Sequence, residues 1–315
     1  MYIGVNSSIV MYHDGVAFDT YMRKGGQYFL FARGGTIGEV IRQRFVDNGV
    51  RVLYVRAQDK GAYDLHAETV FPEMLQDARL PLRERSRLLH AYSIEIGMDL
   101  FRPNGLLALD AEHRARVEKL MDGTYAYLSR ARGAFEGISK LMYHNNTTYN
   151  HCVNVALYTI SLLVRLGYSR TICRHAGAGA TLHDIGKIKV PRKILDKPGR
   201  LTDAEREIIN KHPDDGLIVS RAMELEAMSR DCVIFHHEKL DGSGYPGGVR
   251  SIPEHVRVVT VADIFDALTS DRPYSKCMTT FEAMKIVWME AEAGKLDRDI
   301  CKEFIKMLTQ NGVSV

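Results

Sequence analysis

The stretch TLHDIGK, Thr181–Lys187, decides how the rest of the chain is interpreted. His183 and Asp184 place an imidazole beside a carboxylate, and the two oxygens of Asp184 can contact two metal ions at once. Lys187 adds an ammonium one turn away, where it can meet a phosphate as a point charge. Gly186 is expected to end the local structure. Because the His-Asp dipeptide is common, this stretch alone predicts no function.

Further polar motifs follow the first in a fixed order. They are Lys211-His212-Pro213, His236-His237-Glu238, the loop DGSGYPGG at Asp241–Gly248, and Val261-Ala262-Asp263. With these motifs in this order, residues from about 140 to 310 closely resemble the HD-GYP family of cyclic di-GMP phosphodiesterases. A lone histidine is more often a core or surface residue, but several at matching positions favour a functional site.

The resemblance implies a binuclear metal site. Its ligands would be His151, His183, Asp184, His212, His236, His237 and Asp263. Asp184 would bridge two ions, the first held also by His151, His183 and Asp263, and the second by the remaining three histidines. Imidazole and carboxylate ligands without thiolate suit iron, manganese, zinc or nickel. We expect two divalent ions, with iron or manganese favoured over zinc or nickel.

The loop Asp241–Gly248 holds four glycines around Tyr245-Pro246. Glycine and proline are the usual turn residues, so the loop could be only a tight connection. With the full Gly-Tyr-Pro motif present we favour a functional role, because bare backbone lets a ligand approach and a phenol can donate to a phosphate or stack on a base. The resemblance adds Lys187, Arg272 and Lys276 as further substrate contacts. Relatives carry a basic residue where this chain has Ser275.

The chemistry of such a site suits phosphodiester hydrolysis. A bound metal lowers the pKa of water from about 15.7 to about 7 in the best-known case. The resemblance therefore implies an enzyme in which a metal-activated hydroxide converts cyclic di-GMP to linear pGpG, with Asp184 and Lys187 as catalytic residues. Two alternatives stay open. The chain could be an HD-domain hydrolase of another cyclic dinucleotide or a nucleotide, or a non-catalytic cyclic di-GMP receptor.

Thr147 marks a departure from part of the family. Some members carry a glutamate four residues before the first ligand histidine, and that carboxylate helps to hold a third metal ion. Here the position holds Thr147, and no carboxylate lies between Glu136 and His151. A neutral hydroxyl is a poor ligand for a hard divalent ion. We therefore predict two metals and pGpG as the main product, with a distant carboxylate such as Glu238 as the alternative ligand.

The N-terminal part predicts a small α/β module. Residues 17–23 and 28–33 are rich in aromatic side chains and predict strands, and a third strand is expected over 51–56. Thr36 and Glu39 form a capping-box pattern that predicts a helix to about Asn48. This ββαβ-like unit resembles the short modules found ahead of HD-GYP domains.

A long helix is expected over residues 110–142. Apolar residues recur in it with the four-three spacing of a coiled coil, but a second apolar row beside them favours packing within the chain over a homodimer seam. We expect a mainly α protein: a regulatory module with a helical extension at 1–105, a linking helix at 106–142 that relays its state, and an all-α HD-GYP catalytic domain at 143–315.

Composition excludes several classes of protein. The 315 residues are 45% hydrophobic, and 42 Lys and Arg against 39 Asp and Glu give a net charge of +3, which argues against binding to a nucleic-acid polymer. Five scattered cysteines indicate free thiols in a reducing compartment. No signal peptide and no apolar run of about 18 residues is present, so we expect a cytoplasmic protein away from the membrane. Expected partners are cyclic di-GMP and, by resemblance, signalling proteins that contact the Gly-Tyr-Pro loop.

Overall fold

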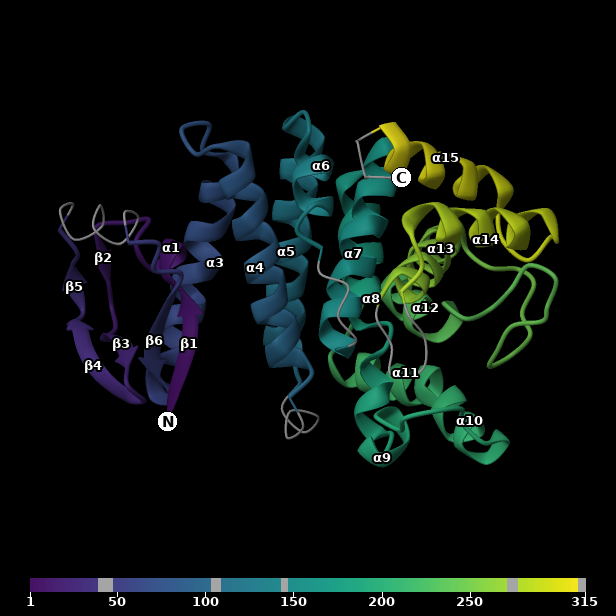
Figure 1. Cartoon of the computed structure of the whole chain (residues 1–315), viewed down its shortest axis with the longest axis horizontal. Helices are drawn as coiled ribbons and strands as arrows, with labels where there is room; N and C mark the ends of the chain where they lie inside the picture. The colour runs from purple at the N-terminus through teal and green to yellow at the C-terminus, as the bar shows by residue number, and fades with distance from the viewer. Residues whose placement is uncertain (39–47, 103–108, 143–146, 271–276, 311–315) are drawn as a thin grey trace. The chain divides into compact units, whose positions relative to one another are not determined.

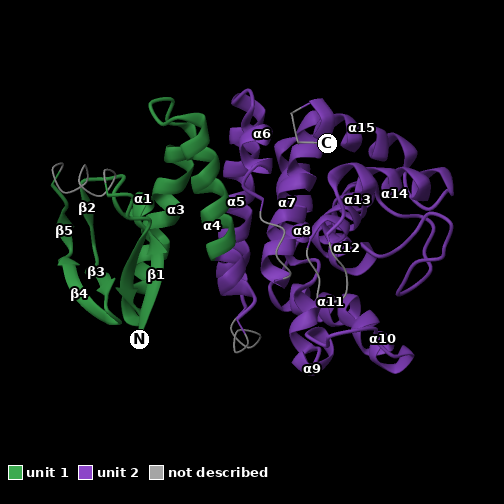
Figure 2. Cartoon of the chain, in the orientation of Figure 1, with its two compact units in different colours: residues 1–95 green, residues 96–315 purple. Residues whose placement is uncertain are grey.

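The computed structural model describes residues 1–38, 48–102, 109–142, 147–270 and 277–310. The chain divides into two compact units, Met1–Glu95 (unit 1) and Ile96–Val315 (unit 2), shown in Figure 2. A small antiparallel sheet belongs to unit 1, whereas unit 2 is all helical (Figure 1). The predicted fold class, mainly α with a small N-terminal α/β module, is confirmed.

Unit 1 is built on a four-stranded antiparallel sheet of order β1-β6-β3-β4. Its strands are β1 Tyr2–Asn6, β3 Thr20–Lys24, β4 Gln27–Ala32 and β6 Val52–Arg56; β2 Gly15–Val16 and β5 Gly35–Thr36 form a separate pair. The remaining elements are α1 Ser7–Val10, η1 Ala57–Asp59, α3 Lys60–Gln76 and α4 Leu82–Leu100, which runs into unit 2. One face of the sheet is apolar, because Val5, Leu53 and Val55 are buried there and α3 packs against β6.

The three strands predicted for this module are present, and their ends differ from the predicted ends by at most three residues. Strand β1 was not predicted, although it pairs with β6 from Tyr2↔Arg56 to Asn6↔Val52. The helix predicted to begin at Thr36 and Glu39 falls largely on residues 39–47, which lie outside the described residues.

Unit 2 holds the helices that carry the polar motifs. They are α5 Ala111–Arg130, α6 Ala134–Ser139, α7 Thr148–Arg165, α8 Arg170–Leu182, η2 Ile185–Lys189, α9 Arg192–Leu195, α10 Asp203–Asn210, α11 His212–Ala222, α12 Ala227–Phe235, α13 Glu254–Thr269, α14 Thr280–Glu292 and α15 Arg298–Gln310. Within the described parts of the chain, no helix is long and apolar enough to cross a membrane. All five cysteines are free thiols, as predicted.

Helix α8 lies at the centre of unit 2, where α5, α7, α12 and α13 pack against it. Two glycines make this close packing possible. A Cβ on Gly177 would come within 2.6 Å of Ile160 Cδ1 and 2.7 Å of Met121 Sδ, and one on Gly179 would come within 2.6 Å of Cys232 Cβ. Bare backbone is therefore needed at both positions. The central helix ends directly before His183 and thereby fixes where the His-Asp pair lies.

The predicted linking helix is interrupted. Helix α5 ends at Arg130, and α6 begins after Gly133, whose φ of 81° is left-handed and ends the α-helical path. Val117, which belongs to the row with four-three spacing, and Leu120, which belongs to the second apolar row, are both buried within this single chain. Packing inside the chain therefore accounts for the apolar pattern, and the seam is not exposed to a second copy.

Candidate metal centre

The seven predicted ligand positions come together in one cluster of unit 2. The end of α8 supplies two of them, and the others come from α7, the first residue of α11, the end of α12, and α13; the seven are His151, His183, Asp184, His212, His236, His237 and Asp263. All but His151 and His237 are buried. Potential ligand atoms in three overlapping groups lie within 4.8 Å of one another.

The two oxygens of Asp184 face two different sets of imidazoles. Its Oδ2 lies 3.8 Å from His151 Nε2 and 3.6 Å from His183 Nε2. Its Oδ1 lies 3.2 Å from His212 Nε2 and 3.9 Å from His236 Nε2. A single carboxylate therefore separates two halves of the cluster and offers one oxygen to each, which is the arrangement of a bridging ligand.

Asp263 closes the cluster from the side of α13. Its Oδ1 lies 3.0 Å from His151 Nε2 and 3.9 Å from His183 Nε2. Its Oδ2 lies 3.6 Å from His237 Nδ1. The first half of the cluster therefore contains two imidazoles and two carboxylates, whereas the second contains three imidazoles and the shared Asp184.

Three of the histidines are held in one tautomer by the backbone. His183 Nδ1 lies 2.7 Å from Ala180 O, His212 Nδ1 lies 2.8 Å from Ile209 O, and His236 Nδ1 lies 3.0 Å from Val233 O. Because a carbonyl oxygen only accepts, each Nδ1 must carry the proton and donate it. Each Nε2 is then left with a lone pair that points into the cluster, as a metal ligand requires.

His151 is oriented by a side chain instead. Its Nδ1 lies 2.8 Å from Oδ2 of the fully buried Asp266. Asp266 also accepts from Asn154 Nδ2 at 2.9 Å and from Ser270 Oγ at 3.2 Å. Asp266 is therefore a hydrogen-bond partner of His151, Asn154 and Ser270. Sequence reasoning missed Asn154 and Ser270, although their spacing from His151 and Asp266 is one helical turn.

The electrostatics of the cluster fit a divalent cation. Burial lowers the pKa of His183 and of His236, and it lowers that of His237 to about 3, so these imidazoles are neutral. Burial alone would raise the pKa of Asp184, but the Lys187 charge and the neighbouring histidines outweigh it and hold this pKa well below its usual value. Neutral imidazoles and ionised carboxylates are the protonation states that bind metals.

Two polar atoms in the cluster are orphaned. His183 Nε2 and Asp184 Oδ1 are buried, and neither has a hydrogen-bond partner among the described residues. A buried polar atom without a partner costs free energy. On the other oxygen of Asp184, the Lys187 ammonium lies at 2.5 Å and supplies positive charge there. Orphaned acceptors beside a carboxylate fit the first coordination sphere of a metal ion.

The surroundings of His151 also favour a positive charge. Burial lowers its pKa, but hydrogen bonds to Asp263 and Asp266 outweigh burial and raise it to about 9. The proton held between His151 Nε2 and Asp263 therefore occupies the place of a cation, and metal binding would displace it.

Gly186 allows the two halves of the cluster to meet. A Cβ at this position would lie 2.0 Å from His212 O and 2.6 Å from Gly216 N, so η2 contacts α11 through bare backbone. Gly186 was expected to end the local structure, but it lies inside η2, and its role is this close approach. His212 begins α11, directly after helix α10, whose start is fixed by a capping box of Thr202 with Glu205.

The Gly-Tyr-Pro loop is fastened beside the cluster by Glu238. This buried carboxylate accepts from the backbone N–H of Gly247 at 2.7 Å and of Val249 at 3.0 Å. Both oxygens of Glu238 therefore bind the backbone of the loop. The loop in turn places the Tyr245 ring 4.6 Å from the His237 ring in a stacked arrangement, and burial raises the pKa of this phenol.

Three other predicted positions have different outcomes. Thr147 directly precedes α7, and its carbonyl accepts from His151 N at 3.1 Å, so it lies one turn before that histidine, as expected. Arg272 and Lys276 fall within residues 271–276, which lie outside the described residues.

The chain belongs to the HD domain family, whose sequence pattern matches residues 109–300, more than half of its length. Among curated relatives it is 34% identical over 236 residues to cyclic di-GMP phosphodiesterase PA4108 of Pseudomonas aeruginosa, covering 73% of this chain and 56% of the relative. It is also 34% identical over 155 residues to 3'3'-cGAMP-specific phosphodiesterase 1 of Vibrio cholerae, covering 49% of this chain and 36% of the relative. The chain thus spans about half or less of the length of these proteins.

The structure is similar to that of Bd1817, an HDG"Y"P protein from Bdellovibrio bacteriovorus. The TM-score is 0.69 at 17% identity, and the likeness covers 98% of this chain and 100% of that one. At this identity the likeness concerns the fold, which is shared from the N-terminal sheet to the last helix. The resemblance drawn from the motifs is therefore confirmed at the level of family and fold.

Proposed function

We propose that this protein is a metal-dependent phosphodiesterase that hydrolyses cyclic di-GMP to linear pGpG. The observation that carries the proposal is the position of Asp184, whose two oxygens face two separate sets of imidazoles. Two metal ions about 3.5–4 Å apart are the usual arrangement for in-line displacement at phosphorus. A relative that matches most of this chain is named as a cyclic di-GMP phosphodiesterase, which supports the choice of substrate.

The two halves of the cluster would each hold one divalent ion. The first would be bound by His151, His183 and Asp263, and the second by His212, His236 and His237, with Asp184 shared. Bound ions would lower the pKa of water and offset charge on the phosphate. Iron or manganese is the proposed metal, and zinc and nickel suit the same donors.

The substrate contacts would come from residues around the cluster. The Lys187 ammonium, which lies against Asp184, would turn to a phosphate oxygen once metal charge reaches that carboxylate. Tyr245 stays protonated because burial raises its pKa, so its hydroxyl can donate to the substrate. Arg272 would bind phosphate with its planar fork, and Lys276 is a further proposed contact, both by family resemblance.

We keep two ions as the proposed number. By resemblance, a third would need a carboxylate four residues before His151, where the chain has Thr147. Glu238 would not supply it, because its oxygens already accept from Gly247 and Val249. With two ions one phosphodiester bond is attacked, and pGpG should accumulate with little GMP.

A second substrate is favoured by a specific observation. The relative named as 3'3'-cGAMP-specific matches this chain at the same 34% identity, although over a shorter stretch. The test is hydrolysis of cyclic di-GMP and of 3'3'-cGAMP by full-length, metal-loaded protein, with chelated protein as control and chromatography of the products. Faster turnover of cyclic di-GMP supports the proposal; binding without turnover of either would establish a receptor instead.

The regulatory organisation is also a proposal. Residues 1–105 would form the sensory module, 106–142 the link, and 143–315 the catalytic domain, with the Gly-Tyr-Pro loop as a contact for signalling proteins. Deletion of residues 1–105 should change the hydrolysis rate of the remaining chain without removing its metal. Unchanged activity and oligomeric state would contradict a regulatory role.

A further inference from the structure

The outer face of the unit 1 sheet carries four tyrosines. In the strand register, Tyr2 pairs with Arg56, Tyr21 pairs with Tyr54, and Tyr28 pairs with Arg23. The four tyrosines therefore lie on the face opposite the apolar core. The Tyr2 and Tyr28 rings are stacked, with centroids 4.1 Å apart, and the Tyr21 ring meets Tyr2 edge-on at 4.8 Å. These contacts join the four rings into one aromatic cluster in which Tyr21 is buried; this side of the sheet is here called the tyrosine face.

Two guanidinium groups lie on the tyrosine face. Arg23 lies over the Tyr28 ring at 5.8 Å, and Arg56 lies over the Tyr21 ring at 5.2 Å. Across the described residues, Arg56 forms no ion pair. The Tyr2 hydroxyl and the Tyr21 ring raise its pKa further, so it stays charged. Asp19, a neighbouring acid, accepts instead from Gly34 N and from the Tyr21 hydroxyl.

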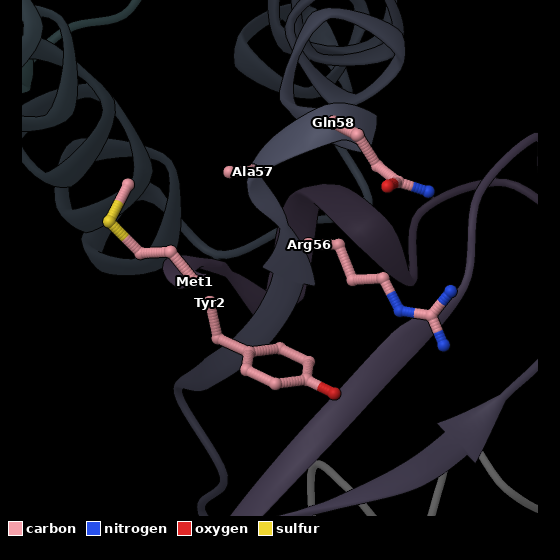
Figure 3. Close-up of a pocket in the computed structure, with 5 residues that line it drawn as sticks. All are labelled: Met1, Tyr2, Arg56, Ala57 and Gln58. Carbon is pink, nitrogen blue, oxygen red and sulfur yellow. The ribbon is translucent and has the colours of Figure 1, made fainter.

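A pocket opens where β6 leaves this face. It has a volume of about 240 Å³ and is lined by Met1, Tyr2, Arg56, Ala57 and Gln58 (Figure 3). Figure 3 shows the Arg56 guanidinium and the Gln58 amide extending to the same side as the Tyr2 hydroxyl. All three groups can donate hydrogen bonds, and no carboxylate is among the lining residues. The lining therefore suits an anion.

The size and shape of the lining narrow the ligand class. Pockets for drug-sized ligands are about 300–1,000 Å³, so this open pocket of about 240 Å³ is too small for a whole dinucleotide, and a single nucleotide would lie partly in it and partly against the exposed Arg56 side chain. A guanidinium donates in its own plane and also stacks through its flat face. The Arg56 guanidinium lies over the Tyr21 ring, and the side chain as a whole is exposed, so the guanidinium is open to a second planar group from solvent.

We propose that this pocket binds a nucleoside monophosphate. The phosphate would accept from the Arg56 guanidinium, the base would stack on the open face of the same group, and the Gln58 amide would bind the polar edge of the base. Through this pocket unit 1 would sense the concentration of a nucleotide, at a site separate from the metal centre of unit 2.

The test is direct binding to the full-length protein by calorimetry. The probes are GMP and AMP, with guanosine, adenosine and inorganic phosphate as their separate halves. Wild type should bind at least one monophosphate about tenfold or more tightly than either of its halves. Arg56→Gln should weaken that binding about tenfold or more, because hydrogen bonds to a charged group are lost.

The matched control is Arg83→Gln, which removes the same charge from an exposed position of α4 outside the pocket. It should bind like wild type. Both variants should hydrolyse cyclic di-GMP at the wild-type rate when no monophosphate is added, which shows that they are folded and separates this site from the metal centre. Equal affinity in Arg56→Gln and wild type would overturn the proposal, and so would phosphate alone binding as tightly as the nucleotide.

Discussion

The metal centre and the tyrosine face use polar groups in opposite ways. In the metal centre, His183 Nε2 and Asp184 Oδ1 are buried without a hydrogen-bond partner among the described residues, whereas Arg56 and Gln58, which line the pocket beside the tyrosine face, are exposed. Burying an unpaired polar atom costs free energy, and a solvated one costs little. Loss of the metal ions therefore lowers the stability of the folded protein in the first region, whereas an empty pocket in the second region costs little stability.

The largest effect is expected at the bridging carboxylate. Asp184→Ala should lower cyclic di-GMP hydrolysis by about a thousandfold or more and reduce the metal content, because several kcal/mol of transition-state stabilisation disappears with the bound ions. Asp214→Ala, an exposed carboxylate in the first turn of α11, is the control and should keep both. Full activity in metal-depleted Asp184→Ala protein would refute the mechanism.

Gly186→Ala tests whether close backbone approach holds the two halves together. Its Cβ would lie 2.0 Å from His212 O, so η2 and α11 must separate. Overpacking of this kind costs about 3 kcal/mol. Thermal unfolding should show the loss, and metal analysis should show a larger deficit than any drop in folded protein explains. A metal content equal to wild type would show that His212 does not depend on this contact.

Asp266→Asn sharpens the contrast between histidines held by backbone and by side chain. The amide keeps the size of the side chain but removes the charge that His151 faces. Loss of such a partner typically costs about 10- to 100-fold in metal affinity. Competition with a chelator measures it, and recovery of activity at raised metal concentration would distinguish this positioning role from a collapsed fold. Unaltered affinity would contradict the role.

The smallest effect is expected in unit 1. Gly61 lies in α3 at a position where an added Cβ meets nothing within 4 Å. Gly61→Ala should raise the free energy of unfolding by about 0.4–1 kcal/mol, because alanine reduces the freedom of the unfolded chain. Chemical denaturation measures this gain, and activity should stay constant. A destabilised variant would mean that α3 is strained at its start.

The ligand cluster was largely predictable, because the motifs stand at recognisable positions in the sequence. The roles of Glu238 and Gly186 were not, since both depend on which backbone atoms come near in the folded chain. Strand β1 was missed for a related reason: it is five residues long, contains Gly4, and is stabilised by β6, which is far away in sequence. The break at Gly133 has a local signal, a glycine, but an apolar pattern continues across it.

The ligand histidines differ in whether the hydrogen-bond partner of their Nδ1 atom can be lost by mutation of another residue. The Nδ1 hydrogen bonds of His183, His212 and His236 go to main-chain carbonyls of the preceding turn, which every amino acid supplies. Substitutions elsewhere leave their tautomers alone. His151 instead relies on Asp266, which in turn relies on Asn154 and Ser270. Natural variation at these three positions can therefore adjust one half of the cluster while the other keeps its affinity, which gives evolution a separate means to tune a shared centre.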